Sequence, residues 1–303
     1  MVGGCGFIGS YVVKGLVDEG WKVVAFDAVV PSPLPEPLRD VAGEVKLVKG
    51  DISNLADLLK VFTTFEIDHI VHLAWVMGED EPLSALKVNT EGMGNLLELA
   101  RLMKTKRVVF ASSEDVYGSA AVQSEPVKED APLWPAARKS HLIYASTKAM
   151  GEYLCEYYNF THGLDFVALR FATVYGFGPR KGWVVDVFEK PVLGVPYRMK
   201  QGNADMYNFI YVKDFAKAIR LALKVRDPAF RIFNVSGGAC TIQYLIDTVK
   251  RFIPETAIQT EPGKDSSRTP PIMDIARARK ILGFEPSYPL EKGVQEYIDK
   301  LKA

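Results

Sequence analysis

The chain has 303 residues, 48% of them hydrophobic and 24% charged, enough for one large α/β domain or two smaller lobes with a core. Its 37 Lys and Arg residues balance its 37 Asp and Glu residues, which argues against nucleic acid or an anionic membrane surface as a partner. The three cysteines lack disulfide or zinc spacing, and no apolar run is as long as a membrane span. We therefore expect a cytoplasmic protein that binds no metal.

The chain opens with three glycines in a G-x-x-G-x-x-G pattern, which lead into an amphipathic helix: Gly3, Gly6 and Gly9. Such a turn lets a diphosphate approach the backbone, and the helix N-terminus offers N–H donors. The apolar run 21–27 then ends in Asp27, which is expected to hydrogen-bond two ribose hydroxyls or to cap the strand end. Residues 28–30 offer no Arg or Lys for a 2′-phosphate, so the pattern predicts NAD rather than NADP.

The start of the chain is unusual for a dinucleotide-binding fold. Only Met1 and Val2 precede Gly3, where a full buried strand is normally found. A missing central strand would leave the backbone groups of its two neighbours unpaired. We expect either that the natural start lies upstream of Met1 or that the strand is reduced to a stub.

The next segments alternate between strand and helix. A short strand within 45–52 ends in an acid, Asp51, which is expected to accept a hydrogen bond from an adenine amine or to cap the helix over 54–62. The strand over 69–75 carries His69 and His72 between apolar residues, which indicates structural roles for both. Asn89, inside a helix over 82–103, is predicted to hydrogen-bond a neighbouring strand and hold the site.

A further strand over 107–111 leads into a polar, acidic loop, and a helix near residue 140 carries Tyr144 and Lys148. Residues four apart share one face of a helix, so the ammonium of Lys148 can favour ionisation of the Tyr144 phenol.

The strands up to residue 171 are nearly all apolar, which is typical of a doubly wound parallel sheet, the Rossmann fold. Ligands of such sheets bind at the carboxyl ends of the strands. Six residues are predicted to share that edge: Gly9, Asp27, Asp51, Ala74, Ser113 and Phe171.

The regular alternation breaks after Phe171. We predict an NAD-binding domain over 1–172 plus 209–236, and a smaller α/β substrate lobe over 173–208 plus 237–303.

Motifs along nearly the whole chain resemble the extended short-chain dehydrogenases/reductases of the NAD-dependent epimerase/dehydratase group. They are Gly3-x-x-Gly6-Phe7-Ile8-Gly9, Gly50-Asp51-Ile52, His72-Leu73-Ala74, Ser112-Ser113-x-x-Val116-Tyr117-Gly118, Tyr144-x-x-x-Lys148, Leu169-Arg170-Phe171-x-x-Val174-Tyr175-Gly176, Phe209-Ile210-Tyr211-Val212-x-Asp214 and Leu282-Gly283-Phe284-x-Pro286. The resemblance implies nucleotide-linked sugars as substrates and tightly bound NAD.

By this resemblance Tyr144 is the catalytic base, Lys148 assists it and holds the nicotinamide ribose, and Ser113 orients the substrate oxygen. The expected cofactor contacts are Gly3, Gly6, Phe7, Ile8, Gly9, Asp27, Asp51, Ile52, Leu73, Ala74, Trp75, Asn89, Tyr144, Lys148, Phe171 and Val174. Glu114 and Asp115 resemble the acid pair of the sugar dehydratases in reversed order. Glu114 is therefore a candidate catalytic carboxylate, and the alternative for Asp115 is that it faces away and caps the loop.

Two departures weaken the nucleotide-sugar expectation. Thr173 replaces an asparagine that often holds the sugar nucleotide, and Tyr207 with Asn208 replaces Arg-Asp, which removes a guanidinium suited to diphosphate. Arg180 and Arg268 are expected either to compensate or to be ordinary solvated arginines. The expected substrate contacts are Ser113, Thr173, Arg180, Tyr207 and Arg268.

The leading hypothesis is an NAD-dependent sugar 4-epimerase. The alternatives are a 4,6-dehydratase that uses Glu114, a dehydrogenase of a free sugar or sugar acid, and a cofactor-sensing protein, which would not need Ser113, Tyr144 and Lys148 together. The resemblance also implies a homodimer built by a four-helix bundle. Candidate contact residues, which could instead simply cover the sheet, are Leu96, Leu97, Met150, Leu154 and Tyr157.

Overall fold

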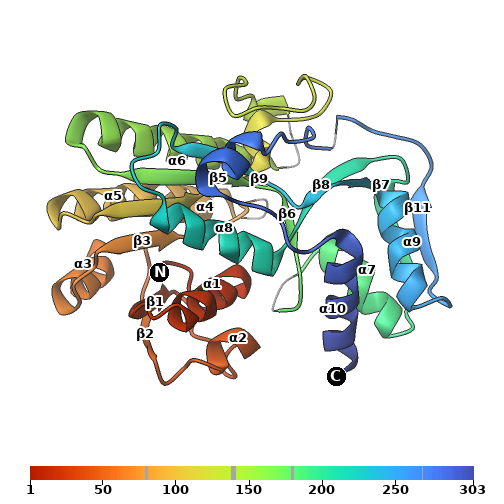
Figure 1. Cartoon of the computed structure of the whole chain (residues 1–303), viewed down its shortest axis with the longest axis horizontal. Coiled ribbons are helices and arrows are strands. Elements are labelled where there is room, and N and C mark those ends of the chain that lie inside the picture. The colour runs from red at the N-terminus through yellow and green to blue at the C-terminus, as the bar shows by residue number, and fades with distance from the viewer. Residues whose placement is uncertain (79–80, 138–140, 179–180, 268) are drawn as a thin grey trace.

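A twisted parallel sheet forms the larger part of the protein (Figure 1). The computed structural model describes residues 1–78, 81–137, 141–178, 181–267 and 269–303. All neighbouring strands of this sheet run parallel, which confirms the predicted doubly wound arrangement. In spatial order they are β2 (Val45–Lys49), β1 (Val23–Asp27), a short segment at Met1 and Val2, β3 (His69–His72), β4 (Arg107–Ala111), β5 (Phe166–Phe171) and β9 (Ile232–Val235).

Met1 and Val2 form a two-residue stub at the centre of the sheet. Val2 donates its N–H to the Val71 carbonyl oxygen at 2.8 Å, and Phe26 donates its N–H to the Met1 carbonyl oxygen, also at 2.8 Å. The stub therefore pairs with β3 on one side and with β1 on the other, so that two residues join both halves into one sheet.

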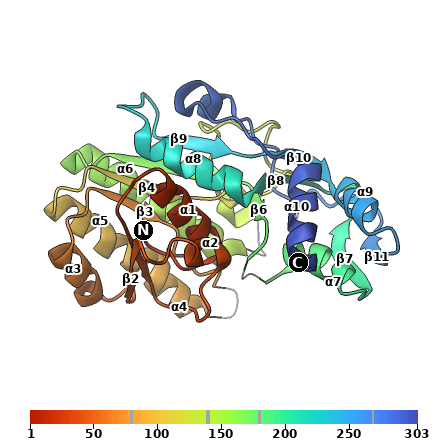
Figure 2. The same cartoon turned by 60° about the horizontal axis from the view of Figure 1, so that its bottom comes forward.

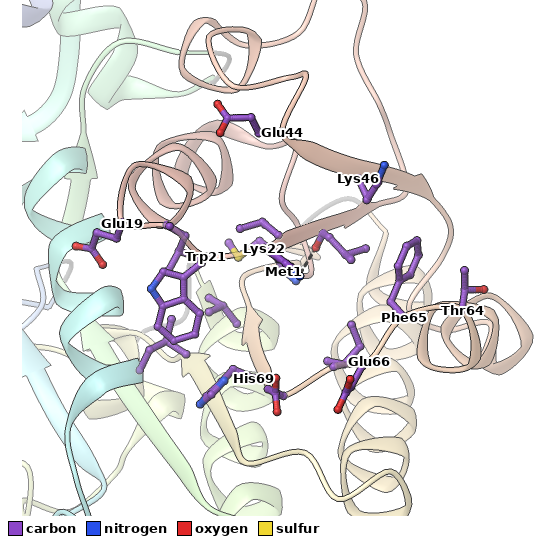
Figure 3. Close-up of a pocket in the computed structure, with 18 residues that line it drawn as sticks. Met1, Glu19, Trp21, Lys22, Glu44, Lys46, Thr64, Phe65, Glu66 and His69 are labelled. Carbon is purple, nitrogen blue, oxygen red and sulfur yellow. Dashed lines mark hydrogen bonds between the residues drawn. The ribbon is translucent and has the colours of Figure 1, made fainter.

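A groove of about 890 Å³ lies beside Met1 (Figure 3). Trp21 and Lys22, which precede β1, line one part, and residues 64–69, which lead into β3, line another. The groove therefore opens at the amino ends of the strands. Because ligands of doubly wound sheets bind at the carboxyl ends, this groove is not the candidate active site.

Helices cover both faces of the large sheet (Figures 1 and 2). One face carries α1 (Phe7–Asp18) and α8 (Val212–Lys224), which pack together; the other carries α3 (Leu55–Thr64), α5 (Gly92–Leu102) and α6 (Leu142–His162). In α8 the buried Phe215, Ala218, Ile219 and Ala222 recur at helical spacing, which gives the helix its apolar face.

The predicted helix over 82–103 is helical throughout but is not uniform. It consists of α4 (Pro82–Leu86), a π-helical turn η1 (Lys87–Glu91) and α5. The π turn contains Asn89, and such turns are frequently found at functional sites.

A smaller group of elements follows β5. In it β8 (Met206–Tyr211) pairs in parallel with β6 (Thr173–Tyr175) and antiparallel with β10 (Gly238–Thr241), while β7 (Tyr197–Gly202) pairs with β11 (Ile258–Glu261). The helices α7 (Trp183–Val192), α9 (Ile242–Phe252) and α10 (Leu290–Lys302) lie at the same end of the molecule (Figure 2). The exact domain boundaries stay a prediction. Other short helices among the described residues are α2 (Glu36–Arg39), η2 (Glu114–Tyr117), η3 (Pro135–Ala137) and η5 (Ala278–Leu282).

The structure corrects part of the expected dimer surface. Leu96 and Leu97 are buried within the subunit, because they lie on the inner face of α5, so they cannot contact a partner. Met150 and Tyr157 on α6 are exposed, and Leu154 is half-buried. In the described part of the chain, no helix combines the length and apolar character needed to cross a membrane.

Candidate active site

The glycine turn between the stub and α1 is shaped to hold an anion. Gly3 has a φ of +78°, and a Cβ on Gly9 would lie 2.0 Å from the Gly3 carbonyl oxygen, so a side chain at position 9 cannot be accommodated without rearranging the turn. A Cβ on Gly6 would meet only the Gly3 oxygen at 3.6 Å, which leaves space beside the turn. The first turn of α1 has neither a side-chain cap nor an acidic residue. These residues fit the diphosphate of a dinucleotide.

Asp27 lies half-buried at the end of β1 and contacts this turn. Its Oδ2 accepts a hydrogen bond from the Cys5 N–H at 3.0 Å, and its Oδ1 accepts one from the Val29 N–H at 3.1 Å. A carboxylate has about four acceptor sites. Asp27 therefore caps the strand end and retains acceptor capacity, so the predicted bonds to ribose hydroxyls are compatible with this cap.

Asp51 does not cap α3. Its Oδ1 accepts hydrogen bonds from the N–H and hydroxyl of Ser53, both at 2.8 Å, whereas Asn54 is the N-cap and accepts from the Ala56 N–H at 3.0 Å. The capping alternative was therefore wrong, because Asn54, which directly precedes the helix, takes that position. Contact of Asp51 and the buried Ile52 with adenine stays a prediction.

Asn89 holds the loop that follows β3. Its side chain exchanges two hydrogen bonds of 2.8 Å with the backbone of Val76, and its Nδ2 also donates to the Thr147 hydroxyl at 3.1 Å. The predicted bond to the backbone is present, although it is made to the loop after the strand. Asn89 therefore fixes residues 73–76 against α6, beside Gly3, whose added Cβ would lie 2.7 Å from the Ala74 nitrogen.

Tyr144 and Lys148 lie on one face of α6, as predicted. The Lys148 ammonium is 5.6 Å from the centre of the Tyr144 ring and donates to the carbonyl oxygen of Ala111, the last residue of β4. Tyr144 is 9% exposed and Lys148 is 1% exposed. The pair thus lies at the carboxyl end of the sheet, beside the strand end that leads directly into Ser113.

Burial and a nearby carboxylate shift the pKa of Lys148 in opposite directions. Burial lowers the pKa of Lys148 well below its usual value, and the nearby Glu152 carboxylate partly opposes this. His72 is fully buried beside it, and burial together with the Lys148 charge lowers the pKa of His72 to about 3. His72 is therefore neutral at pH 7, in agreement with its predicted structural role.

Glu114 connects the end of β4 to the smaller sheet. Ser113, just before it, caps the short helix η2, accepting a hydrogen bond from the Asp115 N–H at 3.2 Å. The buried Glu114 carboxylate accepts hydrogen bonds from the Thr173 hydroxyl at 3.2 Å and from the Asn208 amide at 2.7 Å. The structure thus brings Ser113, Glu114 and Thr173 together.

Asp115 does not face away to cap its loop, as the alternative proposed. Its Oδ2 lies 2.9 Å from Nδ1 of His141, the residue that precedes α6, and the His141 and Tyr144 rings meet edge to face at 6.4 Å. A histidine three residues before a helical tyrosine occupies the same helix face, so this spacing was a signal that the sequence analysis missed.

Three of the other predicted residues pack in or against the hydrophobic core: Phe171, Val174 and Tyr207. Phe171 packs on Phe215 with ring centres 4.7 Å apart, and Val174 is buried in β6. Tyr207 is buried in β8 against Trp183, at 5.1 Å. Arg180 and Arg268 lie outside the described residues.

The helix that carries the glycine turn is also tied to the loop after β6. The Tyr11 hydroxyl donates to the Phe177 carbonyl oxygen at 2.7 Å, and a Cβ on Gly178 would lie 2.5 Å from the Phe7 ring. The start of α1 and this loop therefore pack without a gap.

Solved structures share this fold over the whole chain. UDP-glucose 4-epimerase of Thermus thermophilus, in complex with NAD, superposes with a TM-score of 0.84 at 24% identity, covering 100% of this chain and 98% of that one. A GalE-like L-threonine dehydrogenase from Cupriavidus necator superposes with a TM-score of 0.86 at 22% identity, covering 99% and 98%. The glycine turn and the Tyr144–Lys148 pair thus stand on a fold that these solved structures share.

Sequence comparison gives the family. Residues 1–236 match the NAD dependent epimerase/dehydratase family. UDP-glucuronate 4-epimerase of Thermodesulfobacterium geofontis is 28% identical over 99% of this chain and 94% of its own length. The chain therefore belongs to the NAD-dependent epimerase/dehydratase family and is an enzyme that uses NAD.

Proposed function

We propose that the protein is a nucleotide-sugar 4-epimerase that acts by transient oxidation at C4, with Tyr144 as the base. The observation that carries the proposal is the Tyr144–Lys148 pair at the carboxyl end of β4, beside Ser113 and the anion-binding glycine turn. Relatives at 28% identity that are named UDP-glucuronate and UDP-glucose 4-epimerases support the substrate class.

Each residue has a distinct task in this proposal. Gly3, Gly6 and Gly9 hold the diphosphate of the cofactor, and Asp27 binds its adenosine ribose. When bound, NAD⁺ supplies the hydride acceptor. Tyr144 takes the proton of the sugar hydroxyl and later returns it, the charge of Lys148 stabilises the phenolate, and the Ser113 hydroxyl orients the substrate oxygen.

Glu114 supports a second candidate, a nucleotide-sugar 4,6-dehydratase. Its buried carboxylate points to Thr173 and Asn208 at the border of the smaller sheet, where the sugar is expected. A carboxylate there could remove a C5 proton from an oxidised sugar. Replacing Glu114 with Gln separates the two candidates, since it should abolish dehydration but leave the 4-epimerase base in place.

The test incubates the protein and NAD⁺ with UDP-glucose, UDP-glucuronate or free sugar acids. Interconversion of C4 epimers without net NADH is the expected result. Stoichiometric NADH from a free sugar acid would show a dehydrogenase instead. Replacing Tyr144 with Phe should abolish turnover and leave NAD⁺ affinity within about twofold, and unchanged turnover in this variant would reject the assigned base.

We further propose a homodimer that packs α6 against its copy. Met150, Tyr153, Tyr157 and Phe160 recur at helical spacing on α6, and all four are exposed, Phe160 by 92%. An exposed apolar stripe of this kind is typical of an interaction surface.

A further inference from the structure

The ammonium of Lys148 lies against two neighbouring aromatic rings. Its nitrogen is 4.1 Å from the ring centre of Trp75 and 5.0 Å from that of Phe110, and these two rings are themselves 5.2 Å apart. A cation over an aromatic face is stabilised by the ring quadrupole, most strongly over Trp and when water is excluded. Since Lys148 is 1% exposed, both conditions hold here.

Several contacts fix the Trp75 ring in this position. Its Nε1 donates to the Thr147 hydroxyl at 3.2 Å, and the backbone of the next residue, Val76, is held by both ends of the Asn89 amide. Thr147 also accepts from Asn89 at 3.1 Å, so loop, π turn and α6 share one hydrogen-bond network. The placement of the indole over Lys148 is therefore determined by the fold.

The helix itself leaves room for the two rings. A Cβ on Gly151 would lie 2.7 Å from the Phe110 ring and 3.3 Å from the Trp75 ring. Gly151 is three residues after Lys148, so it lies on the same side of α6. Any larger residue there would displace the rings from the ammonium.

We propose that Trp75 is a positioning residue for the reaction, whose indole face holds the Lys148 ammonium in its charged form next to Tyr144. The inference rests on the proposed role of Tyr144 as base. Burial alone favours a neutral amine, and the aromatic faces oppose that tendency without adding a negative charge that would compete for the proton of Tyr144.

Among the described residues, the other titratable groups around Lys148 come from β3 and α6, while His141, 2.9 Å from Asp115, lies against the Tyr144 ring. His72 on β3 is neutral at pH 7, and Glu152 on α6 is paired with Arg170 on β5 at 2.6 Å. Tyr144 on α6 is the group that responds to the Lys148 charge. Loss of the charge would therefore raise the pH at which Tyr144 ionises.

The test measures Tyr144 ionisation without cofactor or substrate. The tyrosinate absorbance of each protein is titrated against pH, and the same titration with Tyr144→Phe added is subtracted. The series is wild type, Trp75→Phe, which keeps a weaker face, and Trp75→Leu, which has none. Trp21→Leu is the matched control, because it makes the same substitution at the amino ends of the strands, away from Lys148.

The expected Tyr144 midpoints rise in the order wild type, Trp75→Phe, Trp75→Leu, with a total shift of about 0.5 to 1 pH unit. The pKa that governs the acid limb of the pH profile of kcat/KM rises by the same amount. At a fixed pH on that limb, kcat/KM therefore falls about three- to tenfold. Trp21→Leu stays within roughly 0.2 units of wild type.

Equal midpoints along the Trp75 series, or a shift in Trp21→Leu as large as in Trp75→Leu, would overturn the inference. If Trp75→Leu does not fold, the Tyr144 midpoints of wild type and Trp75→Phe are compared instead, and equal midpoints would again overturn the inference. If no sugar is turned over but the midpoints keep their order, the proposed function fails and the role of Trp75 stands.

Discussion

The buried ion pair between Glu152 and Arg170 allows a quantitative prediction about the support of the site. Arg170 on β5 donates to the Glu152 carboxylate from Nε at 2.9 Å and from a terminal nitrogen at 2.6 Å, and the two residues are 3% and 2% exposed. Glu152 also accepts from Ser112, the neighbour of Ser113. The pair thus lies directly beneath the residues that would orient the substrate.

Replacing Glu152 with Gln should destabilise the fold, because it leaves the guanidinium buried without its counter-charge. Removing one partner of such a pair costs about 3 kcal/mol or more. Replacing Arg170 with Met should cost a similar amount, since it leaves a buried carboxylate and removes the bonds of Arg170 to the Tyr117 hydroxyl and the Glu129 carbonyl oxygen. In the double variant both charges of the pair are removed together, so its destabilisation should fall short of the sum by about 2 kcal/mol.

Urea unfolding of the four proteins at pH 7, followed by circular dichroism, gives this coupling energy directly. Single-variant losses below about 0.5 kcal/mol would contradict the assigned burial of the charges. Single-variant losses that add to within about 0.5 kcal/mol would show that the two groups do not interact as described.

Three further predictions concern acid stability, the glycine turn and assembly. His72 binds a proton at pH 6.5 when unfolded but only at about 3 when folded, so acid favours the unfolded state. Between pH 6.5 and 4.5 the free energy of unfolding should fall by about 2–3 kcal/mol more in the wild type than in His72→Leu. Urea unfolding at several pH values measures this difference, and an equal fall in both proteins would refute the prediction. Gly9→Ala should weaken NAD⁺ binding at least about tenfold by calorimetry, because its Cβ would meet the Gly3 carbonyl oxygen, and unchanged affinity would exclude the turn as the binding site. Tyr157→Glu should convert a dimer into a monomer in sedimentation experiments, with the exposed Val29→Glu on another surface as control; a wild type that is already monomeric would refute the dimer.

The alternation of strands and helices along the chain and the position of the Tyr144 helix were predictable from the sequence, because apolar runs and glycine turns are local signals. Contacts between segments far apart in the sequence were not predictable in this way. Nothing near Glu114 indicates that Asn208 donates to it from β8, and the position of Trp75 over Lys148 depends on how a loop packs against a helix. The sequence also suggested Leu96 and Leu97 as surface residues, since periodicity alone does not tell which side of a helix meets the sheet.

The bond from Tyr11 to the loop at Phe177 has a consequence for how ligands influence one another. Tyr11 belongs to the helix whose start would receive the cofactor, and Phe177 follows the first strand of the smaller sheet. Ordering of one partner reduces the conformational freedom left to the other. Thermodynamic reciprocity then requires that whatever NAD⁺ adds to the affinity for the sugar, the sugar adds equally to the affinity for NAD⁺. The hydrogen bond between Tyr11 and Phe177 would thus contribute to the binding of both ligands.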